Sequence, residues 1–143
     1  MFHVRDASNT SIPLADVGEQ RNATIAFADI VGYTVLTTAD ELGTISRWLT
    51  LFGDCIKPAA EALGGRVLDL RGDGVLAEFP DADSALAWSQ AVHAGSEALT
   101  REDTQVAPMT LRVAVHTGAI ISTAHGLFGD TINLAARLQE YAP

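Results

Sequence analysis

The stretch FADIVGYT, residues 27–34, places the carboxylate of Asp29 at the end of a short apolar run that begins at Thr24. Such a run is typical of a buried strand, and Gly32 indicates a tight turn after it. A helix that starts after this turn offers unpaired N–H groups and a positive dipole end, which suit a phosphate. The carboxylate suits Mg²⁺ or Mn²⁺, which bind one or two carboxylates plus substrate phosphates. Taken alone, however, Asp29 is better explained as a helix cap.

A second carboxylate, Asp73, lies in RGDG, residues 71–74, between the apolar runs 66–70 and 75–79. An Asp-Gly pair between two apolar runs predicts a β-hairpin, so Asp73 alone is best explained as a turn residue. The element order places the first strand beside this hairpin, which lets Asp29 and Asp73 converge. Two carboxylates at one place repel each other unless a cation lies between them. The pair therefore favours a divalent metal site.

A third element is GDTINLAARL, residues 129–138, in which Asn133 and Arg137 are four apart and share one face of a predicted helix. An amide and a guanidinium presented together can orient a ribose and stabilise charge on a reacting phosphorus centre. In isolation, an exposed polar helix face explains the two residues equally well. A different stripe of this helix is predicted to be buried, and it consists of Leu134, Leu138 and Tyr141.

Spacing of apolar and turn residues predicts the remaining elements. The capping-box spacing of TADE, residues 38–41, starts a helix that ends at 64–65, and Pro58 should kink or divide it. Its apolar stripe consists of Leu42, Ile45, Leu49, Phe52, Ile56 and Leu63. The later elements are a helix over about 81–99, a loop over 100–107, strands over 109–115 and 119–123, and a helix from 129 to about 141.

The element order is β-α-β-β-α-β with an appended strand and helix. It resembles the ferredoxin-like (palm-type) pattern, in which an antiparallel sheet carries helices, so we predict an α+β fold. Residues 1–20 show no sustained period and are predicted to be a loose N-terminal arm, followed by one domain over 21–143.

Composition narrows the function classes. Eighteen acidic against nine basic residues give a net charge of −9, without the basic face that nucleic acid binding requires. No apolar run approaches the ~20 residues that span a bilayer, and the N-terminus lacks a signal-peptide core. The single cysteine, Cys55, cannot form an internal disulfide. We therefore expect a cytoplasmic protein with no nucleic acid partner and no membrane segment in this chain.

Four segments form an ordered set: FADIVGYT (27–34), GGRV…GDGVLAEF (64–79), VHTG (115–118) and FGDTINLAARL (128–138). In the same order, they resemble the F-x-D-I-x-G-[FY]-T signature, the G-G-x-V…G-D-x-x-L-A-x-F hairpin, the strand-ending H-T-G and the F-G-D-x-V-N-x-A-A-R-L helix of class III adenylyl and guanylyl cyclases. The set covers nearly all of the predicted domain and resembles the bacterial type. The resemblance also implies that a chain stopping at Pro143 lacks the family's last strands and a lysine that contacts the triphosphate.

The resemblance implies a two-metal mechanism at a composite site. Asp29 and Asp73 would chelate two Mg²⁺ or Mn²⁺ ions, with the carbonyl of Ile30 as a further ligand. Asn133 would position the ribose, and Arg137 would stabilise the transition state. The phosphates would lie against the backbone of Val31, Gly32, Tyr33 and Thr34. The substrate, ATP or GTP, would become a 3′,5′-cyclic nucleotide and pyrophosphate. Since family sites combine the aspartates of one protomer with the Asn/Arg helix of another, a head-to-tail homodimer is implied.

Two positions that would contact the base depart from the family pattern. Adenylyl cyclases carry a lysine four residues before the hairpin aspartate, where this chain has Asp69. They carry an aspartate or threonine seven residues before the helix asparagine, where this chain has Gly126 beside His125. Asp69 could instead accept hydrogen bonds from guanine, as the glutamate of guanylyl cyclases does. ATP is favoured because most bacterial members use it, and GTP stays open.

Two other functions stay open. The departures at Asp69 and Gly126, with the short C-terminus, fit a cyclase-homology domain that binds nucleotide and dimerises as a regulatory module. A diguanylate cyclase with a related palm fold is disfavoured, because the hairpin reads RGDGV and not G-G-[DE]-E-F.

Overall fold

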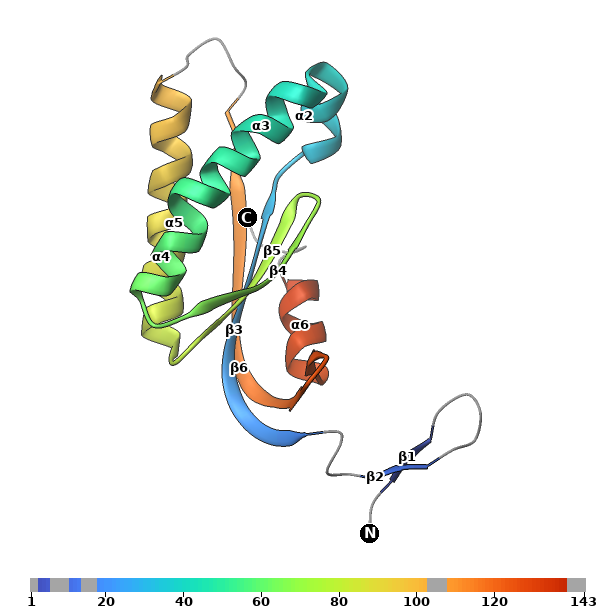
Figure 1. The fold of residues 1–143 in the computed structure, drawn as a ribbon. Coiled ribbons are helices and arrows are strands. Elements are labelled where there is room, and N and C mark those ends of the chain that lie inside the picture. Colours follow the sequence, from blue (N-terminus) through green and yellow to red (C-terminus); the bar gives the residue numbers. More distant parts are fainter. Residues whose placement is uncertain (1–2, 6–10, 14–17, 103–107, 139–143) are drawn as a thin grey trace.

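The computed structural model describes residues 3–5, 11–13, 18–102 and 108–138, and its main feature is a five-stranded antiparallel sheet (Figure 1). The strand order is β4-β5-β3-β6-β7, with β3 at the centre. The strands are β3 (Glu19–Ile30), β4 (Arg66–Arg71), β5 (Gly74–Phe79), β6 (Leu111–Thr123) and β7 (Gly126–Phe128). The helices are α2 (Tyr33–Ala39), α3 (Glu41–Leu51), the π-helix η1 (Phe52–Ile56), α4 (Lys57–Ala62), α5 (Ala82–Glu102) and α6 (Asp130–Leu138). The predicted α+β class with an antiparallel sheet is confirmed.

The central strand β3 divides the protein into two cores. It pairs with β6 along its full length, from Glu19 to Ile30, and with β5 from Thr24 to Asp29. Because side chains alternate along a strand, one face of β3 packs against α3, α4 and α5, and the other packs against α6. Asp29 and its partner Arg112 lie on the α6 side of the sheet, whereas Ile30 and Tyr33 pack in the core beneath α3–α5.

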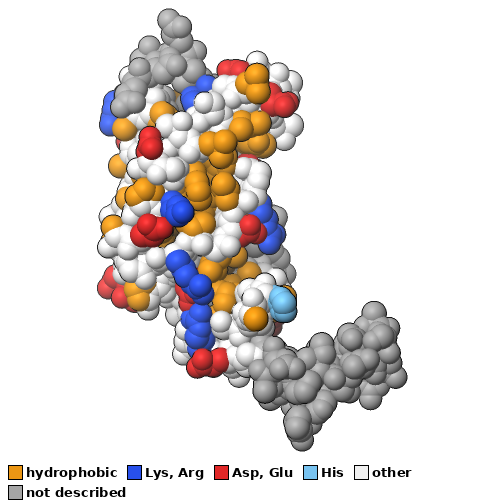
Figure 2. Space-filling model, in the orientation of Figure 1, with side chains coloured by type: hydrophobic (Ala, Val, Ile, Leu, Met, Phe, Trp, Pro, Cys, Tyr) orange, Lys and Arg blue, Asp and Glu red, His pale blue; other side chains and the backbone are white. Residues whose placement is uncertain are grey.

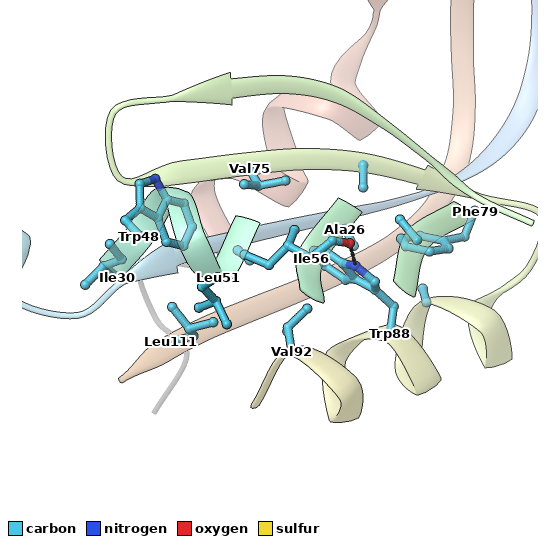
Figure 3. Close-up of a cluster of buried hydrophobic side chains, with 14 of the residues drawn as sticks. Ala26, Ile30, Trp48, Leu51, Ile56, Val75, Phe79, Trp88, Val92 and Leu111 are labelled. Carbon is cyan, nitrogen blue, oxygen red and sulfur yellow. Dashed lines mark hydrogen bonds between the residues drawn. The ribbon is translucent and has the colours of Figure 1, made fainter. Parts of the chain in front are cut away.

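The larger core lies between the sheet and α3–α5 (Figure 3). Trp48 and Trp88 are its largest fully buried side chains. The Nε1–H of Trp88 donates to the carbonyl of Ile56 at 3.0 Å, and its ring lies 5.3 Å from the ring of Phe79, centroid to centroid. A buried indole is stabilising when its N–H has a partner, so this bond ties α5 to the π-helix η1.

The helix predicted over residues 41–63 is divided near Pro58, as the sequence indicates. The π-helical turn η1 lies before α4, and the N–H of Lys57 donates to the carbonyl of Phe52. Pro58 has no N–H to complete a regular α-helical ladder, which accounts for the wider turn. At the other end the side chain of Asp40 caps the helix by accepting from the N–H of Gly43 at 2.9 Å. The predicted cap at Thr38 is wrong.

The predicted buried stripe of this helix is wrong in part. Leu42 and Leu49 are 82% and 51% exposed, whereas Trp48, Leu51 and Ile56 are buried. The large indole of Trp48 decides the rotation of α3, because burying it removes more apolar surface from water than burying either leucine. An apolar strip of α3 therefore faces outward.

The smaller core lies under α6. Its buried apolar members are Ala23, Ile25, Ile120 and Ala135. The hydroxyl of Thr131 donates to the carbonyl of Ala119 at 2.7 Å, and a Cβ added to Gly118 would lie 2.5 Å from that hydroxyl. Glycine at 118 thus lets α6 approach β6 closely.

Burial on α6 differs from the predicted stripe. Thr131 and Ala135 are buried, whereas Leu134 is only half-buried. The side chains of Leu138 and Tyr141 lie outside the described residues. Because α6 lies close to β3 and β6, only small side chains fit between them. A pattern of large apolar residues therefore does not identify the buried side of this helix.

Several boundaries also differ from the prediction. β1 (His3–Arg5) and β2 (Ser11–Pro13) form an antiparallel pair within the predicted loose arm, and β3 begins at Glu19. The helix α5 continues to Glu102, and the two strands predicted over 109–123 are one strand, because β3 supplies partners along its whole length. None of the helices in the described ranges is both long and apolar enough to cross a membrane.

The two tryptophans test the contribution of the indole hydrogen bond. Trp88→Phe removes the donor to Ile56, whereas Trp48→Phe removes an Nε1–H that has no partner among the described residues. Both changes remove similar ring volume, so we expect Trp88→Phe to lower the free energy of unfolding by about 1–3 kcal/mol more than Trp48→Phe. Urea denaturation followed by circular dichroism measures this difference. Equal losses would show that the bond does not stabilise the fold.

Candidate active site

The strand pairing brings the two predicted metal ligands to one end of the sheet. Asp29 is opposite Gly74 in the β3–β5 register, and the N–H of Ile30 donates to the carbonyl of Asp73 at 3.1 Å. The hairpin turn and the end of β3 are therefore adjacent, as the sequence predicted. Ile30, whose carbonyl is the predicted third ligand, directly follows Asp29 and is linked to Asp73 by this backbone hydrogen bond.

Asp29 is held by a basic residue that the sequence did not single out. Its side chain is 10% exposed, and its two carboxylate oxygens accept from Nε and Nη2 of Arg112 at 3.3 and 3.2 Å. Arg112 is opposite Asp29 in the β3–β6 register. In the sequence, Arg112 alternates with apolar residues, which is typical of the solvated face of a strand. Its contact with Asp29 could be predicted only from the pairing of β3 with β6.

The turn after β3 has the geometry that Gly32 indicates. Gly32 has a φ of 67° in the left-handed region, and α2 begins at the next residue. The N–H of Val31, however, donates to the carbonyl of Thr110 at 2.8 Å. This N–H therefore already has a partner in the structure, and the phosphate contacts of Val31, Gly32, Tyr33 and Thr34 stay a prediction.

The predicted base-contacting and ribose-contacting residues lie beside two adjoining hollows on the α6 side of the sheet. The first, which we call the Asn133 pocket, has a volume of about 240 Å³, with polar lining from Asp69, Arg71 and Asn133 and apolar walls that include Phe27 and Leu76. Asp69 and Asn133 are 64 residues apart in sequence, and the fold brings them to one pocket.

The second hollow is a groove of about 630 Å³ between β4 and the turn that joins β6 to β7. Asp69 and Gly126 both line it, so the two residues at the departing positions lie on one groove. Strands β4 and β7 are the opposite edges of the sheet, and they line the same groove because the sheet curls. Gly126 has a φ of 131° and offers no side chain to a ligand.

Asp69 is also paired within its own strand. The Nε–H of Arg71 donates to its Oδ2, and the two side chains are 79% and 39% exposed for Arg71 and Asp69. Arg71 was predicted only as part of the hairpin turn. Its place two residues after Asp69, on the same face of a strand, was the available signal.

Asn133 is exposed on α6, which leaves its amide accessible from the pocket. Arg137 lies four residues later on the same helix, so the predicted common face is consistent with the backbone. The side chain of Arg137 lies outside the described residues.

The donor set fits a hard divalent cation. Two carboxylates and a backbone carbonyl are oxygen ligands of the kind that Mg²⁺ and Mn²⁺ prefer, with water and substrate completing the shell. No cluster of three or more His, Cys, Asp or Glu side chains suited to a metal occurs in the part of the chain that is described.

One further charged cluster lies at the other end of this face. Glu78 accepts from Arg21 and Arg66, and the hydrogen bond from Arg21 is the main cause that lowers the pKa of Glu78 below its ordinary value. The Arg21 bond joins β3 to β5, and the Arg66 bond joins β4 to β5. This cluster is explained by sheet stability and contributes no ligand to the aspartate site.

Comparison with known proteins points to one family. The chain is 35% identical over 123 residues to Putative adenylate cyclase 3 of Rhizobium meliloti and 31% identical over 123 residues to an adenylate cyclase of Streptomyces coelicolor. A solved structure of an adenylate/guanylate cyclase/hydrolase from Silicibacter pomeroyi matches with a TM-score of 0.78 and 28% identity, covering 87% of this chain and 73% of that one.

These matches cover most of this chain but only a small part of each curated relative. Each curated match covers 86% of this chain but only 21% and 31% of the relative, so the chain spans about a fifth to a third of their lengths. No family model matches the chain.

The Arg112–Asp29 pair allows the predicted cation site to be tested. Arg112→Met removes the positive charge beside a buried carboxylate, and we expect a loss of about 2 kcal/mol in unfolding free energy, between that of a surface pair and a buried one. Added Mn²⁺ should then raise the thermal midpoint of Arg112→Met more than that of the wild type, because the ion replaces the lost charge.

The matched control is Arg101→Met, which removes an exposed arginine paired with Glu97 at 3.9 Å on α5. It should change neither the stability nor the response to Mn²⁺ appreciably. An Mn²⁺ response that is the same in the wild type and Arg112→Met would contradict a cation site at Asp29.

Proposed function

Since the chain belongs to the class III adenylyl/guanylyl cyclase family, we propose that it converts a purine nucleoside triphosphate to the 3′,5′-cyclic monophosphate and pyrophosphate. The main support is the adjacency of Asp29 and Asp73 where β3 ends beside the hairpin turn. Asn133 on α6 lines a pocket on the same side of the sheet, and the names of the relatives support a cyclase.

In the proposed reaction, the ribose 3′-oxygen attacks the α-phosphorus and loses its proton to solvent. The bond from the α-phosphorus to the bridging oxygen breaks, and pyrophosphate leaves in line. Asp29, Asp73 and the Ile30 carbonyl would hold two divalent ions. Bound there, such ions make the 3′-hydroxyl more acidic and neutralise charge on the triphosphate. Asn133 would orient the ribose, and Arg137 would stabilise charge at the phosphorus.

Arg112 has a role in this proposal that follows from its contacts. Its guanidinium balances the charge of Asp29 in the structure. A cation that binds Asp29 would compete with it, which would release the guanidinium toward the incoming phosphates. Arg112 therefore balances the charge of a buried carboxylate in the absence of a metal.

A head-to-tail homodimer completes the proposed site. Support comes from the exposed apolar side chains of the described surface, which include Val35, Leu42, Leu49 and Phe128 at 73%, 82%, 51% and 54% exposure. Figure 2 shows hydrophobic side chains gathered in a band down the middle of one face. Exposed apolar side chains of this kind are suited to burial in a contact between two protomers.

The substrate base is the least constrained part of the proposal. Relatives named adenylate cyclase favour ATP, whereas a carboxylate at Asp69 is suited to the N–H groups of guanine. GTP therefore remains the second candidate substrate.

The second candidate function is a regulatory nucleotide-binding domain that dimerises without efficient turnover. The observation that favours it is the absence of a side chain at Gly126, which lines the groove beside Asp69. It differs from the first function in chemistry and not in fold, so only an activity measurement separates the two.

The direct test is incubation with ATP or GTP and Mn²⁺, followed by chromatography of the cyclic product. We expect product from the wild type, a loss of at least about 100-fold in Asp29→Ala and Asp73→Ala, and no product after chelation of the metal. Asp54→Ala, an exposed aspartate on η1, is the matched control and should retain wild-type activity. Absence of product from either triphosphate, with wild type and Asp29→Ala alike, would favour the regulatory domain.

A mixing experiment tests the composite site. Asp29→Ala and Asn133→Ala should each be inactive, but a mixed dimer carries one site with all its groups and one with neither. Equal mixing should therefore restore about a quarter of wild-type activity, because half of the dimers are mixed and each has one working site. Activity that never returns on mixing, although the two variants exchange subunits, would contradict a site built from two protomers.

A further inference from the structure

A separate hollow, which we call the Met109 hollow, lies between α5 and the start of β6, on the side of the sheet away from α6 (Figure 1). Its volume of about 320 Å³ falls within the ~300–1,000 Å³ of typical pockets for small ligands. The C-terminal half of α5 and the segment 108–111 line it. None of its described lining residues is a site residue predicted from the sequence, so the proposed cyclase reaction does not use this hollow.

The polar side chains that join its two walls already have backbone partners. The hydroxyl of Ser96 donates to the carbonyl of Met109. The two ring nitrogens of His93 lie 2.7 Å and 3.2 Å from the carbonyl oxygens of Ser89 and Leu111. Because these polar atoms have partners and the side chains of Met109 and Leu111 are buried and apolar, the inner wall offers a ligand mainly apolar contact.

The charged side chains at the rim of the Met109 hollow cancel each other. Glu97 and Arg101 are four residues apart on α5, and their nearest oxygen and nitrogen are 3.9 Å apart. Arg101 is 72% exposed and Glu97 is 74% exposed, so water solvates both. A charged ligand would lose hydration there without gaining a firmly held partner. Since an apolar cavity of ~150 Å³ holds benzene, the hollow suits a neutral, apolar molecule of about two fused rings.

The segment 108–111 also connects the hollow to the aspartate site. The carbonyl of Thr110 accepts from the N–H of Val31 at 2.8 Å, in the turn after β3. Directly after the segment, Arg112 binds the carboxylate of Asp29. A ligand packed against this segment would stabilise the arrangement in which Arg112 is held against Asp29. A cation at Asp29 has to compete with Arg112, so such a ligand opposes the cation.

We propose that the Met109 hollow is a regulatory site for a small, neutral, apolar molecule, and that its occupation weakens cation binding at Asp29. The ligand site rests on the lining of the hollow itself, whereas the effect on the cation rests on the proposed function. By thermodynamic linkage, the cation weakens binding of the ligand by the same factor.

The methionine methyl groups give a direct probe of the hollow, because the chain has two methionines, Met1 and Met109. With ¹³C in these methyl groups, we expect added indole to shift the Met109 resonance to saturation and to leave that of Met1 unchanged. Indole-3-acetate and tryptamine carry the same ring with a negative or a positive charge. Each should bind at least about threefold more weakly than indole, because its charge loses hydration.

Two variants of one residue test the position of the ligand. Thr100 lines the hollow, and its hydroxyl donates only within α5, to the carbonyl of Ser96 at 3.1 Å. Thr100→Phe fills the hollow and should abolish the Met109 shift, whereas Thr100→Val keeps the shape and should bind indole as tightly as the wild type. Ala94→Phe adds the same ring at an exposed position of α5 outside the hollow. It is the matched control and should retain the shift.

Titration calorimetry with Mn²⁺ measures the effect on the aspartate site. Saturating indole should lower the Mn²⁺ affinity of the wild type at least about fivefold, which is the lower end of ordinary couplings between two sites. The Mn²⁺ affinity of Thr100→Phe should not respond to indole, and that of Ala94→Phe should respond as in the wild type.

An absent or unsaturable Met109 shift, tighter binding of either charged counterpart, or an Mn²⁺ affinity that indole leaves unchanged would overturn the inference. Mn²⁺ binding that responds to indole, in a protein that forms no cyclic product, would support the inference and refute the cyclase proposal. Cyclic product formed at subsaturating Mn²⁺, at a rate that indole does not alter, would do the reverse.

Discussion

The antiparallel pairing of β3 with both β5 and β6 is the constraint on which the rest of the structure depends. It places Asp29 opposite Gly74 on one side and opposite Arg112 on the other. Because side chains alternate along a strand, a slip of one residue would turn Asp29 toward the helices α3–α5 and bury it in an apolar core. The long register with β6 and the two separate cores hold β3 in place and so keep the carboxylate on the α6 side of the sheet.

The α6 side of the sheet carries two separate groups of polar side chains. Its hairpin end collects the aspartates, the Ile30 backbone and the compensating charge of Arg112. The part beside α6 collects Asn133 and the Asp69–Arg71 pair around a small pocket. A chain with a net charge of −9 has few basic residues, and two of its arginines are engaged with aspartates on this face. Charge balance at the carboxylates is therefore part of how the site is built.

Local patterns in the sequence were sufficient for the elements that carry the site. The FADIVGYT stretch, the RGDG hairpin and the helix from 130 were predicted because strand, turn and cap signals act over a few residues. The exposed face of α3 was missed because Trp48 decides its rotation through contacts that no local pattern contains. The continuity of β6 was missed because it depends on β3, about a hundred residues earlier.

The residues missed at the site have a similar explanation. Arg112 resembles a solvated strand residue until the β3–β6 register pairs it with Asp29. Arg71 resembles a turn residue until the curl of the sheet brings β4 to the pocket beside Asn133. For both arginines, the surroundings of the side chain depend on residues far away in the sequence, and the spacing within a motif does not indicate such residues. The hydrogen bond from the N–H of Val31 to the carbonyl of Thr110 is likewise a tertiary contact that no local pattern contains.

A crystal structure with 2′,3′-dideoxy-ATP and Mn²⁺, with manganese located by anomalous scattering, is the sharpest test of a metal site shared between two protomers. We expect manganese on Asp29 and Asp73 of one protomer and the ribose of the nucleotide against Asn133 of the partner subunit. Manganese bound away from both aspartates, or a nucleotide held entirely within one protomer, would contradict it.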